Sequence, residues 1–487
     1  MLKMNPLLLT DFYKIGHVFQ YPPGTEYVYS NLTPRSSRIK GVDEMVFFGL
    51  QYFIKAYLMD YFQNFFTSSK REVLTEYRRV IEHTIGQLPR YNHIEELHEL
   101  GYLPVRIKAL PEGTRVPMRV PCVTIINTDK RFYWLTNFLE TIMSSVIWQP
   151  CTSATLAYQF RLLLNRYAAE TGMPPEFVGW QGHDFSFRGM SAFESAYTSG
   201  MGHLLSFTGT DTIPAILAME EYYGADCSKE LVGGSVAATE HSVMCSGEQG
   251  CELETINRLI TEVYSAGIVS IVSDTWDLWK VCMVYLPLLK DKILAREGKI
   301  VVRPDSGDPV KIICGDPNAT RPAQIKGVVE LLWETFSGTV TSTGHRLLNS
   351  HVGVIYGDSI NLDRAKQICE RLKGKGFASQ CVLGIGSYTY QHNTRDTFGT
   401  AIKATWVQIN GQGVEIFKDP VTDDGVKKSA KGLIKVYRHT VTGDLSYADG
   451  MSWTDEARGE LVPVFCDGKL LVDLTLAEVR KKLWEEI

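Results

Sequence analysis

KIVVRPDSGD (residues 299–308) is the most informative stretch for the architecture, because a buried strand here runs directly into a polar tip. Three other stretches repeat the pattern: IVSIVSD (268–274), HVGVIYGDS (351–359) and QCVLGIGSY (380–388). Each is an apolar run rich in β-branched residues, as is typical of strands in a parallel sheet. Three of the four runs carry Asp at or next to their last residue, so the strands are expected to present carboxylates at a common edge.

The segment between the third and fourth runs predicts a helix. In NLDRAKQICERLK (361–373) the apolar residues recur on one helical face, and glycines follow as stop signals. Strand, polar tip, helix and strand form a parallel α/β unit. We therefore predict an α/β protein built on a (β/α) barrel, with its active site at the carboxyl ends of the strands. A doubly wound open sheet would give the same local pattern.

The two ends of the chain differ from this middle part. Residues 105–127 alternate β-branched residues with Pro and Gly turns, as short antiparallel strands do. Residues 404–418 and 433–447 also predict strands, and 474–484 predicts an amphipathic helix. Because chain termini often meet in space, we expect residues 1–148 and 393–487 to form one α+β domain, with the barrel at 149–392.

Composition limits the possible partners. The chain has 487 residues, with 50 basic and 55 acidic side chains and a net charge of −5, so no global positive field attracts nucleic acid. The longest apolar run, residues 281–289, is too short to span a bilayer. The ten cysteines include no Cys-x-x-Cys pair, which favours free thiols in the cytoplasm. We therefore expect a cytoplasmic enzyme without nucleic-acid or membrane partners.

The strand tips combine groups that suit a sugar diphosphate. Arg303, Asp305 and Gly307 place a guanidinium, a carboxylate and a tight turn within five residues, and Asp274 and Asp358 add two carboxylates. Asp side chains can hold ribose hydroxyls or Mg²⁺, while glycine lets backbone N–H groups reach phosphate. The simpler interpretation of any one of these Asp residues is a cap on the next helix.

Two further segments carry candidate functional residues. HDFSFRG (183–189) and GTDT (209–212) contain Phe185, Arg188 and Asp211, which could form a site for a planar heteroaromatic ring; core packing with a salt bridge is the alternative. In SVAATEHS (235–242), Glu and Ser flank His241. That modestly favours catalysis over the usual structural role of a histidine.

An ordered set of motifs carries a resemblance to a known family. To those already quoted it adds TDFYKIGH (10–17), YPPGT (21–25), YWLTNFLET (133–141), VSDTWD (272–277), TRD (394–396) and FKDPV (417–421). Over about residues 5–470 the chain resembles the nicotinamide phosphoribosyltransferases, which are type II phosphoribosyltransferases. The resemblance implies an irregular (β/α) barrel with an α+β domain built from both ends of the chain. It also implies that nicotinamide displaces pyrophosphate from 5-phosphoribosyl-1-pyrophosphate, giving nicotinamide mononucleotide for NAD salvage.

The resemblance also implies roles for individual residues. Phe185 falls where one face of nicotinamide is stacked, and Tyr13 where the second subunit of a homodimer covers the other face. Asp211 matches the acceptor of the carboxamide NH₂, Arg303 lines the same pocket, and His241 matches the histidine that ATP phosphorylates to drive synthesis. The surroundings of the ribose, phosphate and Mg²⁺ are matched by Asp274, Asp305, Gly357 and Asp358, and Gly386 lies on the loop of the last barrel strand. The phosphate-binding cations of the family are matched by Arg188, Arg35, Arg395, Lys403 and Lys418. We expect Asp274 and Asp305 to serve catalysis together with the histidine, and Mg²⁺ to be carried by the substrate phosphates, with no protein ligand assigned.

Two features depart from the family, and three other functions compete. The tip GIGSY (384–388) is poorer in glycine than in animal members, and residues 314–325 form an insertion-like loop that could be a lid or a surface loop. The nearest rival is nicotinate phosphoribosyltransferase, which Asp211 disfavours: two carboxylates about 4 Å apart at an effective dielectric near 20 repel by about 4 kcal/mol. A Mg²⁺-dependent barrel lyase or aldolase and a non-catalytic binding role are more distant alternatives.

Overall fold

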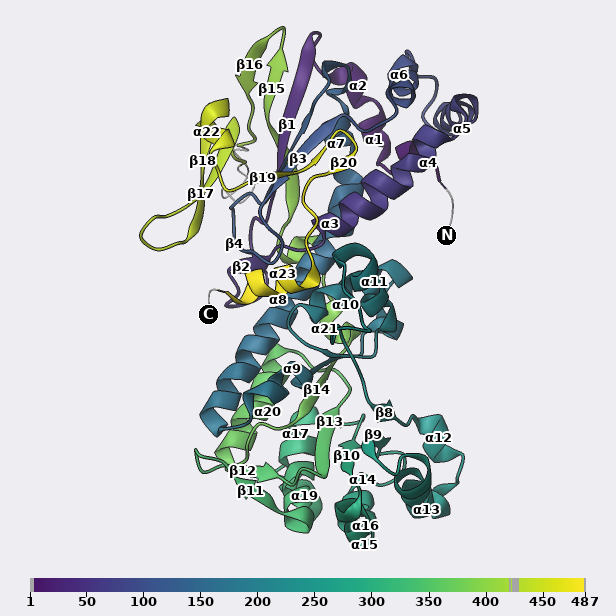
Figure 1. Ribbon diagram of the computed structural model, residues 1–487, viewed down its shortest axis with the longest axis vertical. Helices are drawn as coiled ribbons and strands as arrows, with labels where there is room; N and C mark the ends of the chain where they lie inside the picture. The colour runs from purple at the N-terminus through teal and green to yellow at the C-terminus, as the bar shows by residue number, and fades with distance from the viewer. Residues whose placement is uncertain (1–3, 420–421, 423–428, 486–487) are drawn as a thin grey trace. The chain divides into compact units, whose positions relative to one another are not determined.

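The computed structural model describes residues 4–419, 422 and 429–485, so Pro420 and Val421 of the FKDPV motif lie outside the described residues. The chain divides into two compact units (Figure 1). The first comprises residues 1–155, 218–225 and 393–487, and the second comprises 156–217 and 226–392. The boundary expected at residue 148 lies inside helix α8 (Glu140–Thr171). No helix in these described ranges is long and apolar enough to cross a membrane.

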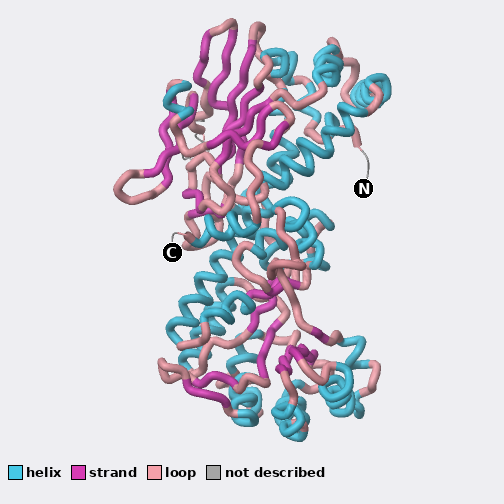
Figure 2. Tube along the Cα trace, in the orientation of Figure 1, coloured by secondary structure: helices cyan, strands magenta, loops and turns pink. Residues whose placement is uncertain are grey.

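The second unit is built on seven parallel strands in the order β7–β6–β14–β13–β10–β9–β8. Strands are drawn in magenta and helices in cyan in Figure 2. Their bounds are β6 (Gly182–Asp184), β7 (Gly209–Thr210), β8 (Ala237–Ala238), β9 (Gly267–Val272), β10 (Gly298–Arg303), β13 (Val352–Tyr356) and β14 (Val382–Ile385). The two edges of the sheet meet just before β8, where Thr210 N donates to Gly234 O (2.9 Å) and Gly234 N donates to Thr208 O (2.8 Å). The sheet therefore curls into an irregular barrel, as predicted, and does not stay open as a doubly wound sheet would.

Helices follow most of these strands. They are α9 (Val178–Gln181), α10 (Phe193–Leu204), α12 (His241–Cys245), α13 (Glu252–Arg258), α14 (Leu278–Lys280), α15 (Leu286–Leu288), α16 (Lys290–Ala295), α17 (Pro309–Cys314), α18 (Pro322–Lys326), α19 (Val328–Phe336), α20 (Leu362–Gly374) and α21 (Ser387–Tyr390), with π-helices at Leu259–Val263 and Val281–Tyr285 and a hairpin of β11 (Gly338–Val340) and β12 (Arg346–Leu348). Helix α20 confirms the helix predicted at 361–373. Asn361 caps it by accepting a hydrogen bond from Arg364 N, and its apolar face is buried. Helix α18 occupies the end of the insertion-like loop.

The first unit contains an antiparallel sheet assembled from both ends of the chain. Its strand order is β16–β15–β1–β5–β3–β19–β20. The bounds are β1 (Thr25–Thr33), β3 (Val105–Ala109), β5 (Val123–Asn127), β15 (Ala401–Ile409), β16 (Gln412–Glu415), β19 (Val462–Cys466) and β20 (Lys469–Leu470), beside two small pairs, β2 (Glu44–Val46) with β4 (Arg115–Pro117) and β17 (Leu433–Arg438) with β18 (Leu445–Met451). Pairing of β1 with β15 and of β3 with β19 joins the N-terminal to the C-terminal segment, which confirms the predicted α+β domain.

The first unit also contains helices beside its sheet. They are α1 (Phe12–Ile15), α2 (His17–Gln20), α3 (Leu50–Phe53), a π-helix at Ile54–Tyr61, α4 (Phe62–Thr67), α5 (Lys70–Glu82), α6 (Asn92–Leu100), α7 (Leu135–Phe138), α22 (Trp453–Ala457) and α23 (Leu476–Trp484); α8 and α11 (Ile213–Tyr223) each belong partly to this unit. The amphipathic segment predicted at 474–484 is α23, which Thr475 and Glu478 begin with reciprocal side-chain-to-backbone hydrogen bonds.

Candidate active site

The predicted residues of the second unit all stand at the carboxyl ends of its strands. Phe185 and Arg188 follow β6, Asp211 follows β7, His241 follows β8, Asp274 follows β9, Arg303 ends β10 and Asp305 follows it, Gly357 and Asp358 follow β13, and Gly386 follows β14. Because the strands are parallel, these ends share one rim of the barrel. Seven separate strands therefore bring together residues that lie up to 201 positions apart in the sequence, from Phe185 to Gly386.

The rim carboxylates are not helix caps. The helices that follow these tips are capped by other side chains: Asp277 accepts from the first turn of α14, and Asp308 from that of α17. Asp274 and Asp305 instead lie between the end of the strand and the capping residue. The sequence alone left capping open for each tip, and the structure removes it for these two.

Asp274 uses its two oxygens differently. Oδ2 accepts hydrogen bonds from the backbone N of Asp305 (2.8 Å) and from Ser306 Oγ (2.6 Å), which ties the β9 tip to the β10 tip. Oδ1 is buried and has no hydrogen-bond partner within the described ranges, but His241 Nε2 lies 3.5 Å from it. The His241 side chain is 50 % exposed. A half-exposed imidazole thus lies beside a buried carboxylate.

Phe185, Asp305 and two glycines form a tight cluster at the rim. A Cβ added at Gly357 would lie 2.8 Å from Asp305 Oδ1 and 3.6 Å from Phe185 Cε2. One added at Gly384, in β14, would lie 2.4 Å from Phe185 Cδ2. The ring of Phe185 therefore packs directly against backbone that carries no side chain. By contrast, a Cβ at Gly386 would lie no closer than 4.0 Å to another residue, at Phe185 O.

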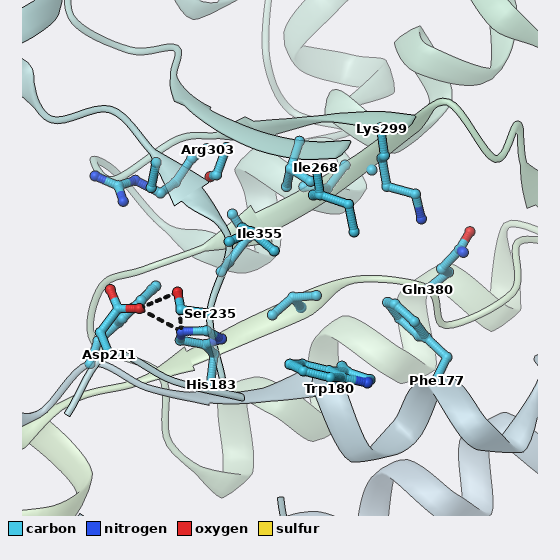
Figure 3. Close-up of a pocket in the computed structure, with 18 residues that line it drawn as sticks. Phe177, Trp180, His183, Asp211, Ser235, Ile268, Lys299, Arg303, Ile355 and Gln380 are labelled. Carbon is cyan, nitrogen blue, oxygen red and sulfur yellow. Dashed lines mark hydrogen bonds and ion pairs between the residues drawn. The ribbon is translucent and has the colours of Figure 1, made fainter. Parts of the chain in front are cut away.

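A cavity of about 280 Å³ runs inside the barrel (Figure 3). Lys299, Val301 and Arg303 line it from alternate positions of β10, as residues on one face of a strand do. Since Lys299 is the second residue of that strand and Arg303 is the last, the cavity extends from the rim toward the opposite end of the barrel. Phe177 and Gln380 line it beside Lys299, whose Nζ lies 5.6 Å from the Phe177 ring centroid, and burial lowers the pKa of this lysine.

Asp211 stands at the rim end of the cavity, next to His183 and Ser235 (Figure 3). His183 Nε2 lies 2.8 Å from Asp211 Oδ1, and Ser235 Oγ donates to the same oxygen at 2.5 Å. Burial by itself raises the pKa of Asp211, but the hydrogen bonds from His183 and Ser235, with the nearby charge of Arg303, bring it below the ordinary value of 3.8. The carboxyl is therefore ionised at neutral pH.

His183 and Ser235 were not predicted as site residues. For His183 a signal was present, because it lies in β6 two positions before Phe185, which directly follows the strand in extended order. The two ring centroids are 4.7 Å apart. For Ser235 there was none, since its position depends on the bridge between Gly209 and Gly234 that closes the barrel. Long-range closure of this kind leaves no local pattern.

The first unit holds a separate cationic cluster. Burial lowers the pKa of Lys403 on β15, and the nearby charges of Arg35, Lys14 and Lys418 lower it further, while Glu140 opposes them. Glu140 forms an ion pair with Lys14 and lies 3.8 Å from Lys403 Nζ. Two other predicted phosphate-binding cations, Arg35 and Lys418, thus lie close enough to Lys403 for their charges to act on it. Lys14, a member of the same cluster, was missed by the sequence analysis.

The remaining predicted residues lie on the surface. In the first unit, Arg395 begins a short 3₁₀ turn, and its exposed guanidinium contacts Asp396 (3.4 Å). Tyr13, on α1, is 60 % exposed, and its ring centroid lies 5.0 Å from Lys14 Nζ. In the second unit, Arg188 is exposed directly after the β6 tip.

The rim carboxylates do not form a cage for a metal ion. Burial and the charges of Asp358, Asp274, Asp305 and Asp308 raise the pKa of Tyr356, so negative charge is concentrated here. Even so, among the described residues no three His, Cys, Asp or Glu side chains converge as metal ligands.

Two sequence models of known families match the chain. A model of the nicotinate phosphoribosyltransferase family matches residues 180–462, and a model of the N-terminal domain of nicotinamide phosphoribosyltransferase matches residues 5–107. Together they take in most of both units.

Three similar proteins from different bacteria share one name. Proteins named nicotinamide phosphoribosyltransferase are 52 % identical in Acinetobacter baylyi (100 % of this chain, 98 % of the relative), 32 % in Xanthomonas campestris (98 % and 97 %) and 35 % in Mycoplasma pneumoniae (89 % and 97 %). Among solved structures, nicotinate-nucleotide pyrophosphorylase from Pyrococcus furiosus superposes with a TM-score of 0.59 at 16 % identity (99 % of this chain, 95 % of that one). Human nicotinic acid phosphoribosyltransferase gives 0.57 at 14 % (97 % and 92 %). At these identities the two structures establish a shared fold.

Proposed function

The chain belongs to the nicotinate phosphoribosyltransferase family, and from this premise we propose that its substrate is the amide, so that it acts as a nicotinamide phosphoribosyltransferase. The pyridine nitrogen of nicotinamide attacks C1 of 5-phosphoribosyl-1-pyrophosphate, the C1–O bond to pyrophosphate breaks, and nicotinamide mononucleotide forms. Full-length relatives with that name and the match to the N-terminal domain support the proposal.

The observation that carries the choice of substrate is the ionised Asp211 at the rim end of the cavity. Its Oδ1 is occupied by His183 and Ser235, so Oδ2 is available to accept an N–H of the carboxamide. Nicotinate would bring its own carboxylate to the same place. At about 4 Å and an effective dielectric near 20 the repulsion is about 4 kcal/mol, or roughly a thousandfold in affinity. Asp211 therefore favours the amide over the acid.

The rim cluster provides for the reacting ring and sugar. Phe185 offers a flat face to the pyridine, and Asp305 lies beside it across Gly357. Displacement at C1 passes through a state in which positive charge develops on the ribose, and a fixed carboxylate at that place stabilises it. The reaction requires no protein nucleophile at the sugar.

Departing pyrophosphate requires positive charge. Bound Mg²⁺ would neutralise part of the charge on the pyrophosphate. Arg188, which follows β6 at the rim, would hold its oxygens. Arg35, Arg395, Lys403 and Lys418 stay candidates for the same role on the strength of the family resemblance. We further propose a homodimer in which Tyr13 and Arg35 serve the site of the partner subunit; the 60 % exposure of Tyr13 in its own chain supports this.

His241 is proposed to accept a phosphoryl group from ATP. Its half-exposed ring is accessible, and Asp274 Oδ1, 3.5 Å from Nε2, favours a proton on that nitrogen. The other ring nitrogen then keeps its lone pair and can attack the γ-phosphorus of ATP, with ADP as the leaving group.

The ten cysteines are free thiols, which supports a reducing, cytoplasmic setting.

A direct assay tests the function. The protein is incubated with nicotinamide, 5-phosphoribosyl-1-pyrophosphate and Mg²⁺, with and without ATP, and the mononucleotide is measured by chromatography. A parallel series replaces nicotinamide with nicotinate. We expect product from the amide far in excess of product from the acid. No product from nicotinamide at any ATP concentration, or faster turnover of nicotinate, would contradict the proposal.

A further inference from the structure

Three strands contribute to one small hydrogen-bond network at the rim end of the cavity. Asp211 follows β7, His183 lies in β6 on one side of it, and Ser235 directly follows Gly234, whose bridge to Gly209 closes the barrel on the other side. His183 Nε2 and Ser235 Oγ both contact Asp211 Oδ1, at 2.8 and 2.5 Å, and lie 3.4 Å from each other. The network therefore spans the seam of the barrel.

The network treats the two carboxylate oxygens unequally. An ionised carboxylate only accepts hydrogen bonds, so Ser235 must donate its hydroxyl hydrogen and His183 must carry a hydrogen on Nε2. Both donors point at Oδ1, and throughout the part of the chain that the structure describes no side chain or backbone group bonds to Oδ2. Figure 3 shows this second oxygen directed away from both donors.

We propose that His183 and Ser235 are positioning residues that select the pyridine carboxamide over the carboxylate, because they hold Asp211 with Oδ1 occupied and Oδ2 presented as an acceptor. This inference rests on the proposed function of the site. If either donor is lost, the carboxyl can rotate, take up a water molecule or become protonated more readily. A protonated Asp211 donates to the carboxylate of nicotinate instead of repelling it, so discrimination between the two substrates falls.

The test is the ratio of kcat/KM for nicotinamide to kcat/KM for nicotinate. Removing one hydrogen bond to a charged group is expected to lower this ratio roughly tenfold in Ser235→Ala and in His183→Leu. The loss should lie mainly in the KM for nicotinamide with kcat nearly unchanged, because the carboxamide contact is the same in the ground and transition states. In His183→Gln the side-chain amide can still donate to Asp211, so the ratio should return toward that of the wild type.

Ser228→Ala is the matched control. Ser228 also donates its hydroxyl to an aspartate at 2.5 Å, but its partner is Asp226 on an exposed turn away from the cavity. The same chemical change there should leave both kcat/KM values as they are in the wild type.

The outcomes separate the two levels of the argument. If the wild type makes no mononucleotide, the proposed function itself is wrong. If the wild type prefers the amide and the ratio stays within about twofold in both Ser235→Ala and His183→Leu, the positioning role is wrong. It is equally wrong if the rates on both substrates fall in parallel and His183→Gln does not restore the ratio, because that pattern indicates a role in folding alone.

Discussion

Replacing Gly384 by alanine tests the geometry beneath the pyridine site. Gly384 lies in β14, and the added methyl would stand 2.4 Å from Phe185 Cδ2 and 2.8 Å from the Cα of Gly357. Non-bonded carbons rest about 3.5–4.0 Å apart, so the ring or the strand must move by about 1 Å. The Gly357 contact is backbone directly after the neighbouring strand β13, and it cannot yield alone. On the other side, His183 limits how far the ring can retreat.

The expected magnitude follows from this crowding. Overfilling a packed position costs about 1–3 kcal/mol of folding stability. Displacing the ring also weakens its stacking on the substrate, which is worth about 0.5–1.5 kcal/mol beyond the buried area. A loss of that size raises the KM for nicotinamide by up to about tenfold. Since the ribose and pyrophosphate groups lie elsewhere, kcat should change much less than KM.

Urea unfolding and steady-state kinetics measure the two effects. Gly374→Ala is the control, because a Cβ there, at the last residue of α20, meets nothing within 4 Å. It should keep the wild-type KM and be at least as stable as the wild type, since alanine favours a helix over glycine. If Gly384→Ala shows wild-type stability and an unchanged KM, the close packing of Phe185 on β14 is wrong. Lower stability with an unchanged KM would retain the packing but show that Phe185 does not stack on nicotinamide.

Three further expectations concern other parts of the chain. His241→Ala should still form mononucleotide but lose ATP stimulation. Asp274→Asn should behave in the same way, because the new amide would turn a hydrogen-bond donor toward His241 Nε2. Full ATP stimulation in either variant would refute the role of His241 as phosphoryl acceptor. Burial raises the pKa of Glu252 from 4.5 to about 7, so the folded protein loses stability as the pH rises through that interval. Glu252→Gln should therefore be more stable than the wild type at pH 8 by up to about 3 kcal/mol, but not at pH 4. Equal urea midpoints of variant and wild type at both pH values would contradict this. Mixed Tyr13→Ala and Asp211→Ala chains should recover toward about a quarter of wild-type activity through hybrid dimers; if subunits exchange and no recovery occurs, the site is not shared.

The architecture was predictable because its signals are local. The apolar runs at 268–274 and 299–308 became β9 and β10, and the amphipathic stretch at 361–373 became α20. Periodicity and stop signals act within a window of a few residues, so one sequence shows them. The extent of the units was less accessible, because residues 218–225 belong with the first unit only through contacts made far along the chain.

The site was predictable only in part, for a related reason. Residue type and strand position identified Asp211 and Asp274, but neither reveals which oxygen of a carboxylate is already engaged. That depends on partners from other strands: Ser235 reaches Asp211 across the seam of the barrel, and Ser306 reaches Asp274 from the neighbouring tip. Hydrogen bonds between residues of different strands follow no sequence period. The sequence can therefore identify the candidate aspartates, but it cannot predict which oxygen of each is already hydrogen-bonded.

The two carboxylates use a common arrangement that explains how a rim of acids can be both stable and reactive. Asp211 and Asp274 each give one oxygen to protein donors that fix the side chain. The second oxygen is left for a different partner, which is His241 for Asp274 and, in the proposed function, the carboxamide for Asp211. A buried carboxylate without donors would become protonated and lose its charge, whereas one with both oxygens bonded would have nothing to offer a ligand. Hydrogen bonds to one oxygen keep the carboxylate ionised and fix the direction of the other oxygen. The barrel strands thus hold one oxygen of each acid and leave the second oxygen exposed to a partner.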